Sequence, residues 1–192
     1  MIVDSMSQLE IKKYLYNNVP ESEKIIKFFK SNLRRQALKS SLSYVFNTIY
    51  KCKIHNITFY SVFYNINKKH WGSMLFATFF YRNSIRVVSL NPDNGTLHWY
   101  SSHYRERAVE RINNSDYSLI NFFKTQTSIS IASDHQVIDT NSTCFVHKDY
   151  LFVIDASIEG ILFYKTCIPA ERDTYVCKHL IKSYLNSIKQ TT

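Results

Sequence analysis

Three closely spaced segments rich in β-branched and aromatic residues constrain the fold of this chain most. They cover residues 57–64, 71–81 and 85–90, and short polar stretches separate them. Such residues favour extended backbone because their side chains pack well on a pleated surface. Tyr81-Arg82-Asn83-Ser84 has the composition of a hairpin turn, and Asn91-Pro92-Asp93-Asn94-Gly95 that of a loop at the end of the third segment. The sequence therefore predicts three consecutive strands.

Helices are predicted before and after these strands. Asp4 or Ser7 can cap a short helix that runs through Tyr16, and Pro20 stands at a first-turn position of a longer helix. Apolar residues at helical spacing predict that this second helix continues toward the first strand, with or without a break; they are Ile25, Phe28, Phe29, Leu33, Leu38, Leu42, Val45, Phe46 and Ile49. Alternating charges and apolar positions predict a surface helix over 99–112.

The second half of the chain mixes strand and helix patterns. Residues 117–123 and 128–131 have strand character, and the largely apolar run from Cys144 to Ile158, which ends at Gly160, predicts a buried helix. An amphipathic helix is expected over 172–188. The length of 192 residues suits one domain. We divide it into a helical part over 1–52, a core of sheet and buried helix over 57–158, and a C-terminal helix within 159–192.

The composition narrows the classes of protein. No run of about 18 uncharged apolar residues occurs, and the first residues lack the apolar run and cleavage site of a secretory signal, so a soluble protein is expected. Four cysteines without CxxC spacing favour a reducing compartment. The cysteines and histidines have no metal-ligand spacing, and no nucleic-acid or phosphate-loop motif occurs.

The formal net charge of +9 favours an anionic partner. Nucleic acid, an acidic protein, a membrane surface and a polyphosphate all meet this description, and solvated helix faces that serve solubility are the alternative. Arg34 and Arg35 contribute a basic side to the predicted second helix, and Lys178 and Lys182 do the same for the C-terminal helix. The charge alone does not choose among these partners.

One set of residues suggests catalysis. Cys144 follows a polar loop at the start of the predicted buried helix, whose N-terminus would favour a thiolate. His70 begins the second strand, and Asn91 or Asp93 follows the third strand at the same end of the hairpin, where either could orient the imidazole. Gln136 could donate to an oxyanion. Each residue alone is more often structural, but the order His, Asn or Asp, Cys is that of a thiol nucleophile with its base.

These residues carry a family resemblance. His70-Trp71, Asn91-Pro92-Asp93, Gln136 and Cys144 follow one another as in the adenain and ubiquitin-like protease group, clan CE, which includes the YopJ-type effector acetyltransferases. Ile168-Pro169, Tyr175-Val176-Cys177-Lys178-His179 and Tyr184-Leu185-Asn186 resemble segments near the end of the YopJ-type catalytic core. The chain departs from the family pattern at Thr143 and Phe145, which flank Cys144.

The resemblance implies an α+β fold with a central mixed sheet flanked by helices. It implies that Cys144 takes acetyl from acetyl-coenzyme A and passes it to Ser, Thr or Lys of a host protein, as a secreted effector does in the host cytoplasm. His70 would be the base, Asn91 or Asp93 would orient it, and Gln136 would hold the oxyanion. Inositol hexakisphosphate would activate the enzyme, with basic residues offered for anionic ligands: Arg34, Arg35, Lys178, His179 and Lys182.

Two alternatives stay open. The same catalytic residues could cleave an isopeptide bond, which would make the protein a ubiquitin or ubiquitin-like protease. The chain could instead be a degenerate, non-catalytic module that binds through basic residues, although its Phe and Tyr residues alternate at core spacing, which favours burial over nucleic-acid stacking.

Overall fold

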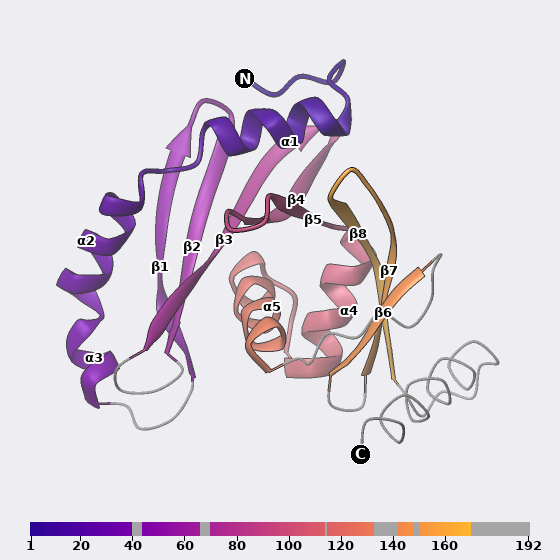
Figure 1. The fold of residues 1–192 in the computed structure, drawn as a ribbon. Coiled ribbons are helices and arrows are strands. Elements are labelled where there is room, and N and C mark those ends of the chain that lie inside the picture. The colour runs from indigo at the N-terminus through magenta and orange to yellow at the C-terminus, as the bar shows by residue number, and fades with distance from the viewer. Residues whose placement is uncertain (40–43, 66–69, 114, 133–141, 148–149, 170–192) are drawn as a thin grey trace.

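One mixed sheet organises the protein. The computed structural model describes residues 1–39, 44–65, 70–113, 115–132, 142–147 and 150–169 (Figure 1). Its strands are β1 (Tyr44–Ile54), β2 (Ile57–Asn65), β3 (Trp71–Tyr81), β4 (Ser84–Asn91), β5 (Thr96–Tyr100), β6 (Ser142–His147), β7 (Tyr150–Ile158) and β8 (Ile161–Pro169). Its helices are α1 (Gln8–Asn17), α2 (Ser22–Asn32), α3 (Arg34–Lys39), α4 (Ser102–Asn113) and α5 (Leu119–Ala132). The predicted α+β class with helices around a mixed sheet is confirmed.

The strand order is β1-β2-β3-β4-β5-β8-β7-β6. The first five strands form an antiparallel meander, and β8 joins it by parallel pairing with β5. The predicted hairpin turn at 81–84 is confirmed, because Arg82 and Asn83 both have positive φ, 49° and 59°, which is typical of a tight two-residue hairpin. The predicted loop at 91–95 links β4 to β5, and Gly95 takes the positive φ of 68° that its turn requires.

Helices cover both faces of the sheet. Alternate residues of β2, β3 and β4 point to opposite sides, and consecutive residues are buried in the middle of each strand, so both faces are covered there. In Figure 1, α4 and α5 lie within the curve of the sheet, and α1 and α2 lie outside it. The inner cluster joins the sheet to α4 and α5 through Val62, Phe76, Val87, Tyr100, Tyr104, Ala108, Val109, Phe122, Phe123, Ile129, Tyr164 and Cys167. The outer cluster packs Ile11 and Leu15 of α1 on the opposite face.

The first helices begin close to their predicted positions. Ser7 caps α1, since its hydroxyl accepts from the backbone N–H of Glu10 and the Glu10 carboxylate accepts from the N–H of Ser7. The prediction that the second helix extends to Ile49 is wrong. The helices of this region end at Lys39, and β1 begins at Tyr44 and pairs with β2. This pairing satisfies backbone groups of β2 that a helix could not reach, so the helical part does not extend to residue 52.

Two predictions in the second half are also wrong. The strands expected over 117–123 and 128–131 are replaced by the helix α5, in which Phe122, Phe123 and Ile129 are buried on one side. Thr125 and Thr127 fit this helix because each hydroxyl donates to the carbonyl four residues earlier. The buried helix expected from Cys144 to Ile158 is instead the antiparallel pair β6 and β7. Short apolar runs show no periodicity that distinguishes a buried helix from a buried strand.

Three further predictions concern α4, the turn before β8 and the C-terminal helix. The surface helix predicted over 99–112 starts later, at Ser102, since Trp99 and Tyr100 belong to β5. The apolar run that was predicted to be a helix does end before Gly160, but what ends there is the strand β7, since Glu159 and Gly160 form the turn between β7 and β8 with positive φ. The helix expected over 172–188 lies outside the described residues.

Candidate functional site

The residues predicted to form a catalytic triad lie at separate places in the sheet. His70 is exposed and directly precedes β3. Leu90 of β4 pairs with Leu75 of β3, so Asn91 is level with a position four residues along the strand from His70. At about 3.3 Å per residue this separation is roughly 13 Å. The hairpin therefore returns Asn91 to the same end of the sheet as His70, but not to its side.

Asn91 and Asp93 have roles within their own turn. The side-chain oxygen of Asn91 accepts from the backbone N–H of Asp93 at 3.1 Å, and the backbone carbonyl of Asn91 accepts from the hydroxyl of Tyr16 at 3.1 Å. The Asp93 side chain is exposed. These contacts fix the link between β4 and β5, which agrees with a structural role for Asn91.

Cys144 does not lie at a helix N-terminus, which corrects the prediction made for it. It belongs to β6, where it pairs with Val153. Four strands lie between β3 and β6, which makes five inter-strand spacings, and at about 4.8 Å per spacing the two strands are roughly 24 Å apart along the sheet. The helices α4 and α5 fill the inside of its curve (Figure 1). The described part of the chain therefore does not bring Cys144 and His70 together.

Of the other predicted site residues, the structure describes only the two arginines. Arg34 and Arg35 are exposed in the first turn of α3. Gln136, Lys178, His179 and Lys182 lie outside the described residues. The roles given to these residues stay predictions from the sequence.

Alkylation of Cys144 tests the triad. Because His70 directly precedes β3, which is distant from β6, we expect His70→Ala to leave the rate at which iodoacetamide modifies Cys144 near neutral pH unchanged. Mass spectrometry of the peptide that contains Cys144 measures this rate. A fall of about tenfold or more would show that the imidazole activates the thiol, as a triad requires.

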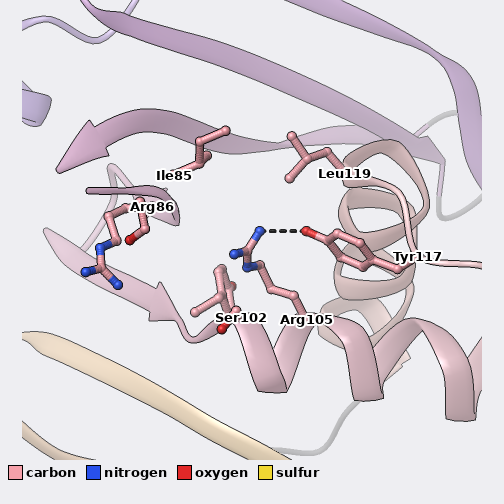
Figure 2. Close-up of a pocket in the computed structure, with 8 residues that line it drawn as sticks. Ile85, Arg86, Ser102, Arg105, Tyr117 and Leu119 are labelled. Carbon is pink, nitrogen blue, oxygen red and sulfur yellow. Dashed lines mark hydrogen bonds between the residues drawn. The ribbon is translucent and has the colours of Figure 1, made fainter. Parts of the chain in front are cut away.

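A different site lies at the end of the sheet where β4 begins and β5 ends. It is a cavity of about 410 Å³ that also reaches the first turn of α4 and the start of α5 (Figure 2). We call it the arginine cavity, and its lining consists of Ser84, Ile85, Arg86, Tyr100, Ser102, Arg105, Tyr117 and Leu119. None of these eight residues is acidic.

Local sequence places Arg105 in this cavity. Chain direction changes after Tyr100, where the hydroxyl of Ser101 accepts from the backbone N–H of Tyr104 at 3.0 Å and so caps α4. Arg105 lies one turn into the helix, beside the buried Tyr104 and four residues before the buried Val109. The cap and the apolar stripe together direct Arg105 inward rather than to solvent.

Arg105 is a buried cation without a described carboxylate partner. The residue is 8 % exposed. One terminal nitrogen donates to the hydroxyl of Tyr117 at 2.6 Å, and the guanidinium carbon lies 5.7 Å from the centre of the Tyr117 ring. Its Nε is buried and meets no hydrogen-bond acceptor among the described residues. Figure 2 shows the guanidinium beneath Ile85 and Leu119, with its hydrogen bond to Tyr117.

Tyr117 supplies a hydroxyl to the same site. Burial raises the pKa of the Tyr117 phenol, and the guanidinium of Arg105 acts in the opposite direction. The net shift is upward, so the phenol keeps its proton at neutral pH. Because its oxygen accepts from Arg105, that proton is left to donate to another acceptor.

Arg86 stands at the rim of the arginine cavity. Its Nε donates to the backbone carbonyl of Tyr81 at 3.3 Å, and the side chain is half-buried. Figure 2 shows its guanidinium directed away from Arg105. Arg86 therefore adds positive charge near the mouth, whereas Arg105 supplies the charge inside.

A second cavity of about 470 Å³ opens where β4 ends and β5 begins. Asn91, Asp93 and His98 contribute to its lining. Its buried hydroxyls already have partners within the protein, since Ser89 bonds to Tyr100 at 2.7 Å and Thr127 donates to a backbone carbonyl at 2.8 Å. The unsatisfied buried cation makes the arginine cavity the stronger candidate.

Arg105 and Tyr117 were not among the residues predicted from the sequence. The sequence does indicate that Arg105 is buried, because Tyr104, Ala108 and Val109 form an apolar stripe at helical spacing that includes position 105. No comparable signal identifies Tyr117, since its contact with Arg105 depends on how α4 and α5 pack.

The described residues contain no group of three or more His, Cys, Asp or Glu side chains that could hold a metal ion. Within the same part of the chain, none of the helices combines the length and the apolar character needed to cross a membrane.

Comparison with known proteins identified no relative of this chain. Searches against models of protein families, curated proteins and solved structures found no match to this chain. The resemblance to the adenain and ubiquitin-like protease group therefore rests on the sequence motifs alone.

Proposed function

We propose that this protein is a non-catalytic binding module that recognises a small anionic ligand through Arg105. The observation that carries the proposal is the burial of a guanidinium group, 8 % exposed as a residue, in a cavity without a carboxylate among its lining residues. A net charge of +9 agrees with an anionic partner.

The free energy of burying a charge supports this proposal. A charged side chain removed from water costs several kcal/mol unless an opposite charge and hydrogen bonds compensate for it. Tyr117 gives Arg105 one hydrogen bond and the edge of an aromatic ring, but no negative charge. A bound anion would supply the missing charge and an acceptor for the guanidinium.

The surroundings suit an oxyanion such as phosphate, sulfate or carboxylate. Guanidinium groups bind these anions with paired hydrogen bonds. The hydroxyl of Tyr117 is a further donor, and Ser102 lies at the N-terminus of α4, where backbone N–H groups and the helix dipole favour negative charge.

Cysteine-dependent acyl transfer is not the function that we propose. Acetyl transfer from acetyl-coenzyme A and isopeptide cleavage both require Cys144 next to His70, and the strand order separates them. Both activities, and the finer assignment to the adenain-like fold, remain predictions from the sequence motifs.

Calorimetric titration with inorganic phosphate tests the proposal. We expect phosphate to bind the wild-type protein at one site, and Arg105→Ala to weaken binding by about tenfold or more, since a hydrogen bond to a charged group contributes about 1.5–3 kcal/mol. Arg105→Lys retains the charge without the planar fork and should bind with intermediate affinity.

Arg107→Ala is the matched control for the loss of a positive charge. Arg107 belongs to the same helix but is exposed and paired with Glu110 at 2.7 Å. We expect this variant to bind phosphate as the wild type does. Equal losses in Arg105→Ala and Arg107→Ala would mean that general charge attraction, rather than the cavity, binds the anion.

A further inference from the structure

One part of the mouth of the arginine cavity is apolar. Ile85 lines this part and is 56 % exposed. Phe80, which pairs directly with Ile85 across β3 and β4, is 58 % exposed. Directly opposed residues of neighbouring strands point to the same face, so Phe80 and Ile85 form one apolar surface next to the buried cation.

The interior walls continue this character. Leu119 and Tyr117 line the space around the guanidinium of Arg105 (Figure 2), and the buried Tyr100 is a further lining residue. A volume of about 410 Å³ falls within the range of cavities that hold organic ligands. The cavity therefore offers more room and more apolar contact than a bare inorganic anion would use.

The charge of the site limits the charge of the ligand. One guanidinium lies inside, and that of Arg86 stands at the rim and points away. A phosphate monoester carries about 1.5 to 2 negative charges at neutral pH, which two cations can balance. Inositol hexakisphosphate carries many more charges, and the exposed Arg34 and Arg35 that suggested a polyphosphate are on α3, a different element.

We propose that the arginine cavity binds a phosphate monoester carried on an aromatic group, with the phosphate on Arg105 and Tyr117 and the aromatic ring against Ile85 and Phe80. This inference rests on the proposed function and specifies its ligand class. The phenol hydroxyl and the guanidinium hold the phosphate oxygens, while the apolar pair covers the face of the ring. Burial of the ring also removes the exposed surface of Ile85 from water.

Phenyl phosphate is the probe for this inference. We expect the wild-type protein to bind phenyl phosphate about tenfold more tightly than inorganic phosphate, as one additional apolar group in a matching pocket does. Ile85→Ser should lose this advantage, so that the ratio of the two dissociation constants falls to about one. Leu38→Ser serves as the control, because Leu38 is 57 % exposed on α3, and it should keep the advantage.

The outcomes separate this inference from the proposed function. Equal affinity for phenyl phosphate and inorganic phosphate, with both lost in Arg105→Ala, would overturn the aromatic ligand and leave anion binding standing. Absence of binding for both would overturn the proposed function itself. Tighter binding of inositol hexakisphosphate than of phenyl phosphate, lost in Arg34→Ala/Arg35→Ala, would overturn the inference in favour of a surface polyphosphate site. Thermal unfolding of each variant, with Arg105→Lys as the milder change, confirms that the variants are folded.

Discussion

Arg105→Met is expected to stabilise the ligand-free protein and to abolish anion binding. The methionine side chain retains an unbranched apolar stem of similar length and fills an irregular space well. It removes a buried cation for which the described residues supply no carboxylate. Replacing buried charges by apolar groups of similar volume is neutral or stabilising by about 1–4 kcal/mol, and we expect a gain of about 1 kcal/mol here.

Loss of the Tyr117 contact does not offset this gain. Tyr117 is 39 % exposed, so its hydroxyl can bond to water once Arg105 is gone. Urea unfolding measures the change in the free energy of unfolding. Arg107→Met, at an exposed and paired position, should change stability by less than about 0.5 kcal/mol. A marked loss of stability in Arg105→Met would mean that Arg105 stabilises the fold in the absence of a ligand, which contradicts a role in anion binding alone.

Phe76→Ala is expected to cause the largest loss of stability, about 3–5 kcal/mol. Phe76 is fully buried at the centre of the inner cluster. Its ring stacks on Phe123 of α5 at 4.6 Å between centroids and lies within 6.5 Å of the rings of Phe122 and Tyr100. Truncation leaves a cavity exactly where α5 meets β3, and the aromatic contacts around it are lost.

Phe80→Ala provides the comparison for Phe76→Ala within the same strand and on the same face. Phe80 is 58 % exposed, so its truncation should cost less than about 0.5 kcal/mol. The two free energies of unfolding, measured in urea, should differ by several kcal/mol. Similar losses at both positions would contradict the packing of α4 and α5 inside the curve of the sheet.

Strands β2, β3 and β4 could be predicted from the sequence because local chemistry and tertiary packing agree there. Their residues alternate between the two faces, and the turns that separate them carry residues such as Asn83, which tolerates a positive φ. Ser7 and Glu10 likewise mark the start of α1 by a local capping box. None of these features depends on distant parts of the chain.

The elements that were wrongly predicted depend on distant partners. β1 became a strand because β2 was available to pair with it, although Val45 and Ile49 also fit a helical stripe. α5 became a helix although its Thr and Ile residues favour strands, because Phe122 and Phe123 pack on the inner face of the sheet. The run after Cys144 formed β6 and β7, since a neighbouring strand, β8, extends the sheet.

The candidate site was missed for the same reason. Sequence motifs for catalysis consist mainly of His and Cys residues, whereas the arginine cavity depends on Arg105 and Tyr117. These two residues come together only when α4 packs beside the start of α5. The order of His70, Asn91 and Cys144 along the chain suggested a triad but did not predict the order of the strands in the sheet. Four strands lie between β3, which directly follows His70, and β6, which contains Cys144. Parallel pairing of β5 with β8, which joins the first five strands to β7 and β6, has no local sequence signal.

Arg105 is a buried cation, and we propose that a bound anion is its partner. The most direct test is the free energy of unfolding of the wild-type protein and of Arg105→Met, each with and without saturating phosphate. Without phosphate the variant should be at least as stable as the wild type. With phosphate at about 100 times its dissociation constant, the wild type should gain about 2.7 kcal/mol and the variant nothing. Equal gains in both proteins, or none in the wild type, would contradict the account.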